Sequence, residues 1–66
     1  MQVWINGKPG ELADDARVPD ALTLLGVPQT GVAVAVDGAV VPRAAWDATP
    51  LKPGDTIEIV RARQGG

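Results

Sequence analysis

The 66-residue sequence contains no cysteine, histidine, serine or tyrosine. It therefore cannot assemble a Ser-His or Cys-His nucleophile pair, a disulfide, or a metal site built on imidazole or thiolate. Lys8 and Lys52 each precede a Pro-Gly pair, and we expect both to be solvated. The neighbouring carboxylates of Asp14 and Asp15 are typical of a solvated surface loop. We therefore predict that the chain is not an enzyme by itself.

Aromatic residues and net charge are also scarce. The two tryptophans are the only aromatic residues, so a core must consist mostly of Val, Leu, Ile and Ala. A net charge of −2 argues against binding to the phosphate backbone of nucleic acids. No apolar run approaches the roughly 20 residues of a membrane span, and no signal peptide is visible. We expect a small cytoplasmic domain with no bound cofactor, no membrane partner and no nucleic-acid partner.

The first half of the chain predicts a hairpin followed by a short helix. Residues 2–5 have the composition of a strand, and Asn6-Gly7 is the dipeptide best suited to a tight hairpin turn. A return strand is expected over residues 10–13, at an edge of the sheet because Pro9 lacks an N–H. A helix is expected from Val18-Pro19 to residue 25, since proline suits its first turn and Gly26 its end.

The second half predicts another hairpin and a final strand. Residues 31–36 alternate large and small apolar side chains, the period of a strand. Asp37-Gly38 marks a turn, and residues 39–41 form the return strand, which Pro42 ends. Residues 43–50 are expected to be irregular, with Trp46 packed against this segment. Residues 52–55 form a tight turn into the last strand, which ends near Val60.

This order of elements predicts an α+β fold with a mixed sheet of four or five strands packed on one short helix. The last strand most easily pairs beside the first. Strand alternation separates two sheet faces. The face packed on the helix is expected to hold Val3, Ile5, Leu22, Leu25, Val34, Val36, Ile57 and Ile59. The uncovered face is expected to hold Trp4, Ala33, Ala35, Glu58 and Val60, either as a docking surface or as ordinary exposed surface.

The chain ends in Arg61-Ala62-Arg63-Gln64-Gly65-Gly66, directly after its most strand-like segment. We expect residues 1–62 to form the domain and residues 63–66 to form a flexible tail. Glycine has no Cβ, so Gly65 and Gly66 suit entry into a narrow tunnel. A tail of this kind is useful if the terminal carboxylate is itself the reacting group.

Taken together, these features resemble the ubiquitin-like β-grasp sulfur carriers, most closely those of thiamine biosynthesis. The resemblance covers essentially the whole chain and rests on the order of several short motifs. These are Asn6-Gly7, the run from Val32 to Gly38, Val41-Pro42-Arg43, Trp46, the segment from Leu51 to Asp55, and the final Gly65-Gly66. The basic approach to the diglycine, through Arg61 and Arg63, departs from the more aliphatic approach common in that family.

The resemblance implies a β-grasp fold and a cycle in which partner enzymes supply all the catalytic groups. An adenylyltransferase of the ubiquitin-activating type would use ATP to join the Gly66 carboxylate to AMP. Sulfur from a donor such as a cysteine desulfurase or rhodanese would then give a thiocarboxylate, which a thiazole synthase consumes. Gln64 and Arg63 would enter the partner's tunnel together with Gly65. Trp4, Val60 and Arg61 are the candidate partner surface.

Three alternatives remain open from the sequence. The carrier could deliver sulfur to molybdopterin, to tRNA or to another thio-metabolite. The chain could instead be a β-grasp interaction or RNA-binding module, although its diglycine and acidic charge argue against this. It could also be a modifier that is conjugated to lysines through Gly66.

Overall fold

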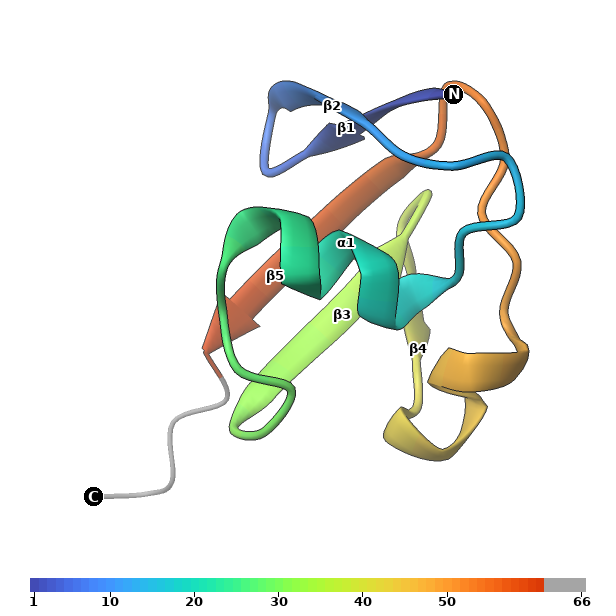
Figure 1. Cartoon of the computed structure of the whole chain (residues 1–66). Helices are drawn as coiled ribbons and strands as arrows, with labels where there is room; N and C mark the ends of the chain where they lie inside the picture. The colour runs from blue at the N-terminus through green and yellow to red at the C-terminus, as the bar shows by residue number, and fades with distance from the viewer. Residues whose placement is uncertain (62–66) are drawn as a thin grey trace.

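A computed structural model describes residues 1–61 as a mixed five-stranded sheet with one helix lying across it (Figure 1). The strand order is β2-β1-β5-β3-β4, so the last strand lies at the centre of the sheet. The predicted α+β architecture is confirmed. The elements are β1 (Gln2–Ile5), β2 (Lys8–Glu11), α1 (Val18–Leu25), β3 (Val32–Val36), β4 (Ala39–Val41), the 3₁₀ helix η1 (Arg43–Ala48) and β5 (Thr56–Arg61).

Both predicted hairpins are present, and both turn at positive φ. Asn6 and Gly7 have φ values of 52° and 82°, and Asp37 and Gly38 have values of 51° and 87°. The prediction of the first return strand was wrong by two residues. A two-residue turn brings Lys8 directly opposite Ile5, so pairing starts there rather than at Gly10.

The final strand pairs beside the first, as predicted. β1 and β5 are parallel, with Trp4 opposite Thr56 and Ile5 opposite Ile57. β3 pairs with β5 in the antiparallel sense along its whole length, from Val36 opposite Ile57 to Val32 opposite Arg61. β5 is therefore paired on both sides in its first half.

Local sequence signals define both ends of α1. At its start, the Arg17 N–H donates to the Asp20 carboxylate (2.7 Å), and Pro19 lies in the first turn. At its end, Gly26 adopts a left-handed conformation (φ 81°), and its N–H donates to the Leu22 carbonyl (3.0 Å). These contacts satisfy backbone groups that a helix leaves unpaired at its ends.

The core lies between α1 and the sheet. Six of the predicted core residues are buried, and Val36 is partly buried against them. Leu25 was wrongly predicted to belong to the core, because its side chain is 40% exposed. Helical spacing places Leu25 on the buried face of α1. It is the last residue of the helix, however, and the described residues cover its side chain only in part. The smaller Ala21 is fully buried instead.

Segments between the regular elements complete the core. Four residues of these segments are buried, although strand alternation and helical spacing did not predict them as core residues: Leu12, Ala16, Trp46 and Leu51. The segment around Trp46 is a 3₁₀ helix rather than irregular chain, and the indole N–H donates to the Val41 carbonyl (2.9 Å). The predicted packing of Trp46 against this segment is thus confirmed, with the guanidinium of Arg43 5.2 Å from the centre of its ring. Within residues 1–61, no helix is long and apolar enough to cross a membrane.

Candidate functional site

The candidate site begins where β5 ends. Of the residues predicted to act there, Trp4, Val60 and Arg61 are described by the structure. Arg63, Gln64, Gly65 and Gly66 lie outside the described residues, and so does the predicted domain boundary at residue 62. The last described residue before this segment is Arg61, at the end of the central strand of the sheet.

Asn6 holds the second half of β5, where β1 no longer pairs with it. β1 ends at Ile5, which leaves one side of β5 without a strand partner beyond Ile57. The Asn6 side chain replaces that partner. Its oxygen accepts from the Ile59 N–H (2.8 Å), and its amide nitrogen donates to the Ile59 carbonyl (3.2 Å). Sequence reasoning identified Asn6 only as a turn residue and missed this second role.

The first half of β5 is fixed by two aspartates. The Thr56 N–H donates to the Asp37 carboxylate (2.9 Å), and the Asp37 N–H donates to the Thr56 carbonyl (2.7 Å). Asp55, which is only 6% exposed, accepts from the Lys52 N–H (2.8 Å) and closes the predicted turn before the strand. These contacts, together with those of Asn6, anchor β5 nearly to its last described residue.

The sheet face opposite α1 is open and partly apolar, as predicted. On this face Trp4, Val40 and Val60 are 41%, 74% and 60% exposed, and Glu58 is exposed as well. Arg61 is also exposed, but it pairs with Val32 and alternates with Ile59, so it belongs to the α1 side of β5. A shallow hollow of about 110 Å³ lies on this face and is lined by Ala33, Val34, Ala35, Val40, Glu58 and Val60. The small alanines of β3 leave room between the larger side chains of β4 and β5. This face continues along β5 towards Arg61.

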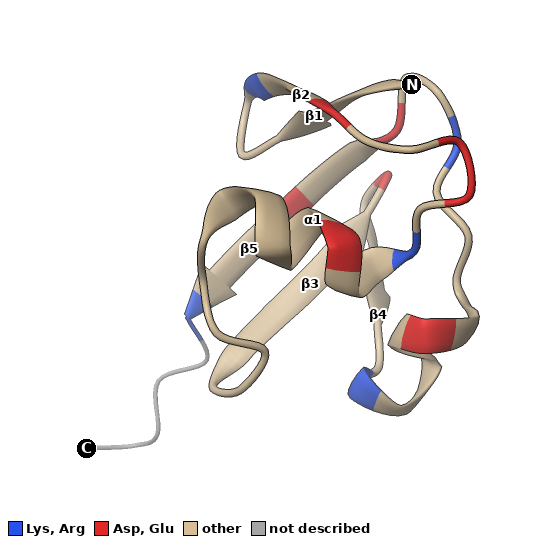
Figure 2. Ribbon diagram, viewed as in Figure 1, with Lys and Arg blue, Asp and Glu red and all other residues tan. Residues whose placement is uncertain are grey.

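Charges are distributed unevenly around the fold. Acidic residues gather at the end of β2 and on the loop that leads to α1 (Figure 2). The α-amino group of Met1 lies 3.0 Å from the Glu11 carboxylate and 3.4 Å from that of Asp14, and it also donates to the Leu12 carbonyl. The hydrogen bond with Glu11 raises the pKa of this amino group above its ordinary value of 8.0, and Asp14 adds to the effect. Among the described residues, no group of three His, Cys, Asp or Glu side chains could hold a metal ion.

Comparisons with known proteins agree on one family. The model of the ThiS family matches residues 3–66. The sulfur carrier protein ThiS of Thermus thermophilus is 34% identical over 64 residues, which cover 97% of this chain and 98% of that protein. The crystal structure of the thiamine biosynthesis protein ThiS from Geobacter metallireducens is 38% identical and covers all of both chains, with a TM-score of 0.83. The solution structure of a thiamine biosynthesis protein from the same organism gives a TM-score of 0.76 over all of this chain and 88% of that one.

Proposed function

The chain belongs to the ThiS family, and we propose that it is a sulfur carrier of thiamine biosynthesis that carries sulfur on its C-terminal Gly66. The observation that carries the proposal is the family match, which runs from residue 3 through Gly66 and includes the diglycine. The fold supports it as well, since in the sequence these glycines follow shortly after β5, the firmly anchored central strand of the sheet.

The proposed chemistry starts from an unreactive group. A terminal carboxylate has a pKa near 3.3–3.7, so it is an anion and a poor electrophile at neutral pH. In the proposed cycle, an adenylyltransferase of the ubiquitin-activating type joins this carboxylate to AMP and releases pyrophosphate from ATP. A sulfur nucleophile, supplied through a desulfurase or rhodanese, then displaces AMP. The resulting thiocarboxylate on Gly66 delivers its sulfur to a thiazole synthase.

In this cycle the chain supplies reach and recognition rather than catalytic groups. Five residues follow Arg61, and fully extended they span about 16–18 Å. That length takes the Gly66 carboxylate into a recessed nucleotide site while the domain stays outside it. The absence of Cβ atoms at Gly65 and Gly66 suits a narrow entrance. Arg63 and Gln64 are proposed to contact the walls of that entrance.

The open sheet face is proposed as the partner surface. Trp4 and Val60 are large apolar side chains exposed on this face, and Arg61 lies where β5 ends. Buried aromatic side chains often dominate the binding energy of an interface. An activating enzyme that docks on this face would hold the domain while the residues after Arg61 enter its active site.

Deletion of Gly66 tests the proposal. The deletion moves the terminal carboxylate back by about 3.5 Å, and a displacement of even about 1 Å can cost roughly 100-fold in rate. ATP–pyrophosphate exchange with the activating enzyme of the host should therefore fall to background, while thermal melting of the variant stays unchanged. Gly65→Ala serves as an intermediate case that should fold normally and exchange more slowly. Exchange at the normal rate by the deletion variant would refute Gly66 as the reacting residue.

A further inference from the structure

The chain carries its own nucleophiles, and their positions matter if Gly66 is activated. A primary amine can attack the carbonyl carbon of an acyl adenylate. A C–N bond then forms, the C–O bond to AMP breaks, AMP leaves with the electron pair, and the amine proton passes to water. The product is a lactam within one chain, and that chain can no longer carry sulfur. The sequence offers three such amines, which are the α-amino group of Met1 and the side chains of Lys8 and Lys52.

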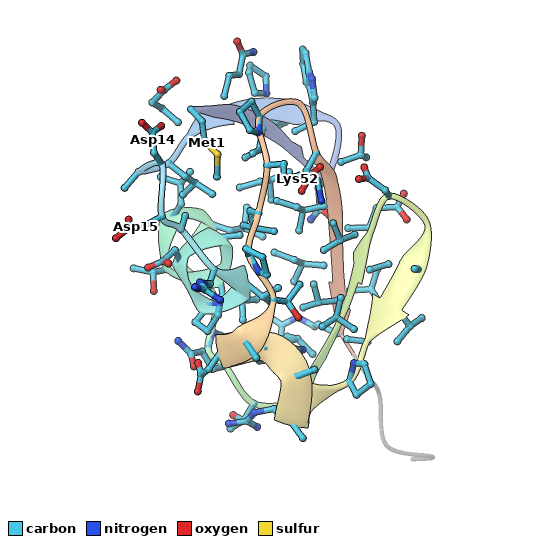
Figure 3. All side chains as sticks on the ribbon, turned by 90° about the vertical axis from the view of Figure 1, so that its right-hand side faces the viewer. Met1, Asp14, Asp15 and Lys52 are labelled. Atoms are coloured by element: carbon cyan, nitrogen blue, oxygen red, sulfur yellow. The ribbon has the colours of Figure 1, made fainter. Side chains whose placement is uncertain are left out.

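Two of these amines lie at the end of the sheet where β5 starts. Because Trp4 is opposite Thr56 in a parallel pair, Met1 lies about eight residues, or roughly 26 Å, behind Arg61 along the strand direction. Lys52 belongs to the turn that precedes β5, where its carbonyl accepts from the Asp55 N–H (3.0 Å). Figure 3 shows Met1, Asp14 and Lys52 in the upper part of the molecule, with the ribbon of β5 running from there towards the opposite end.

Lys8 carries the nearest of the three amines, and it too lies at a distance from Arg61, the end of β5. It pairs with Ile5, which pairs with Ile57 on the neighbouring strand. Lys8 is therefore about 13 Å behind Arg61 along the strands and about 10 Å to the side, since two strand spacings separate β2 from β5. To reach Lys8, the five residues after Arg61 would have to reverse direction and span most of their extended length.

Met1 carries the amine with the highest intrinsic reactivity. An ordinary α-amino group with a pKa of 7.7–8.0 is roughly one quarter to 40% neutral at pH 7.5, whereas a lysine is only about 0.1% neutral. In the fold, the Met1 amino group contacts the carboxylates of Glu11 and Asp14 and donates to the Leu12 carbonyl, and these contacts favour its protonated form. Its raised pKa lowers the neutral fraction that could attack an acyl group.

The cations closest to the terminus are of a different kind. Arg61, at the end of β5, and Arg63, three residues before the terminus, are both arginines. A guanidinium keeps its proton at all physiological pH values and is not a useful nucleophile, whereas a lysine readily loses its proton in a suitable environment. Positive charge is therefore available near Gly66 without a primary amine.

From this arrangement, and resting on the proposed function, we propose that the fold separates the primary amines of the chain from its activated C-terminus. The acyl group on Gly66 then survives long enough to react with the sulfur nucleophile of a partner. Positive charge near the terminus is confined to Arg61 and Arg63, because a guanidinium does not attack the acyl group.

The test uses the full chain with Gly66 prepared as the thioester of a small thiol, which stands in for the activated acyl group. Intact mass spectrometry at pH 7.5 follows two products, the hydrolysed acid and a lactam that is lighter than the acid by one water molecule. Three proteins are compared, namely the wild type, Lys8→Arg, and the exchange variant Lys8→Arg/Arg61→Lys. The exchange variant has the composition, net charge and mass of the wild type and differs only in where the amine lies.

The exchange variant should form the lactam about tenfold or more faster than the wild type, because an amine only five residues before Gly66 has a high effective concentration at the acyl group. The wild type and Lys8→Arg should give mainly the acid. Equal lactam rates in the wild type and the exchange variant would overturn the proposal. Peptide mapping should locate the new amide bond at position 61.

A second measurement needs no variant. Unfolding the wild-type thioester in guanidinium chloride releases Met1 from Glu11 and removes the separation, so lactam formation should accelerate relative to hydrolysis. An unchanged ratio of lactam to acid would show that the fold offers no protection. Because the thioester is installed chemically, neither result depends on the activating enzyme. Failure here is thus distinguishable from failure of the adenylation assay.

Discussion

Leu22→Ala should bring the domain close to global unfolding. Leu22 is fully buried and is the largest of the fully buried side chains between α1 and the sheet. Truncating a buried leucine to alanine costs about 2–5 kcal/mol, which includes the cavity left behind. A disulfide-free domain of this size seldom has more than about 3–5 kcal/mol of stability in total. The substitution therefore removes most of the free energy of unfolding.

Leu25→Ala is the matched control for this prediction. It makes the same chemical change in the same helix, but at a side chain that is 40% exposed. The cost should be less than about 1 kcal/mol. Guanidinium denaturation followed by far-UV circular dichroism gives both midpoints under identical conditions. Similar shifts of the two midpoints would refute the placement of Leu22 in the core and of Leu25 at the exposed end of the helix.

Three further substitutions test other parts of the account. Trp4→Ala should fold normally but lose about 2 kcal/mol or more of binding to the activating enzyme, which calorimetry measures; a lower melting temperature with unchanged affinity would make Trp4 a structural residue. Asp55→Ala removes a buried carboxylate, leaves the partly buried Lys52 N–H without its acceptor, and should cost about 1–3 kcal/mol in denaturant titrations. Asp47→Ala, at an exposed aspartate, should cost little. Glu11→Gln removes the main cause of the raised pKa of the Met1 amino group, so it should destabilise the fold below about pH 8. The difference in stability from the wild type should vanish as the pH rises through the folded-state pKa of this group. A difference that persists at high pH would refute this linkage.

Local signals allowed much of the fold to be predicted from the sequence. Asn6-Gly7 and Asp37-Gly38 place both turns because few residues accept positive φ. The position of β5 beside β1 follows from the order of the elements. Leu25 could not be predicted correctly, because helical spacing determines the direction of a side chain and not what lies opposite it. Leu51 is buried in a core whose members are distant in sequence, with its N–H bonded to the Ala16 carbonyl, and no local pattern reports such contacts.

The candidate site was predicted only in part. Alternation along the strands correctly placed Trp4 and Val60 on the open face, and their role there remains a prediction. The clamp from Asn6 to Ile59 was missed, because the strong turn signal of Asn6-Gly7 already accounted for the asparagine. A signal was nevertheless present. β1 ends opposite Ile57, whereas β5 continues to Arg61, and only a side chain with both a donor and an acceptor can replace the missing strand there.

The central claim, that Gly66 carries sulfur, is tested most directly by the intact mass of the chain purified from its native host. A fraction of the molecules should be heavier by the difference between one sulfur and one oxygen atom. Fragmentation should place that difference on Gly66, and deleting the gene for the activating enzyme should remove it. A chain that never carries this shift, or carries it at another residue, would rule out Gly66 as the sulfur-carrying residue. A shift by the mass of a whole protein would instead identify a modifier that forms conjugates.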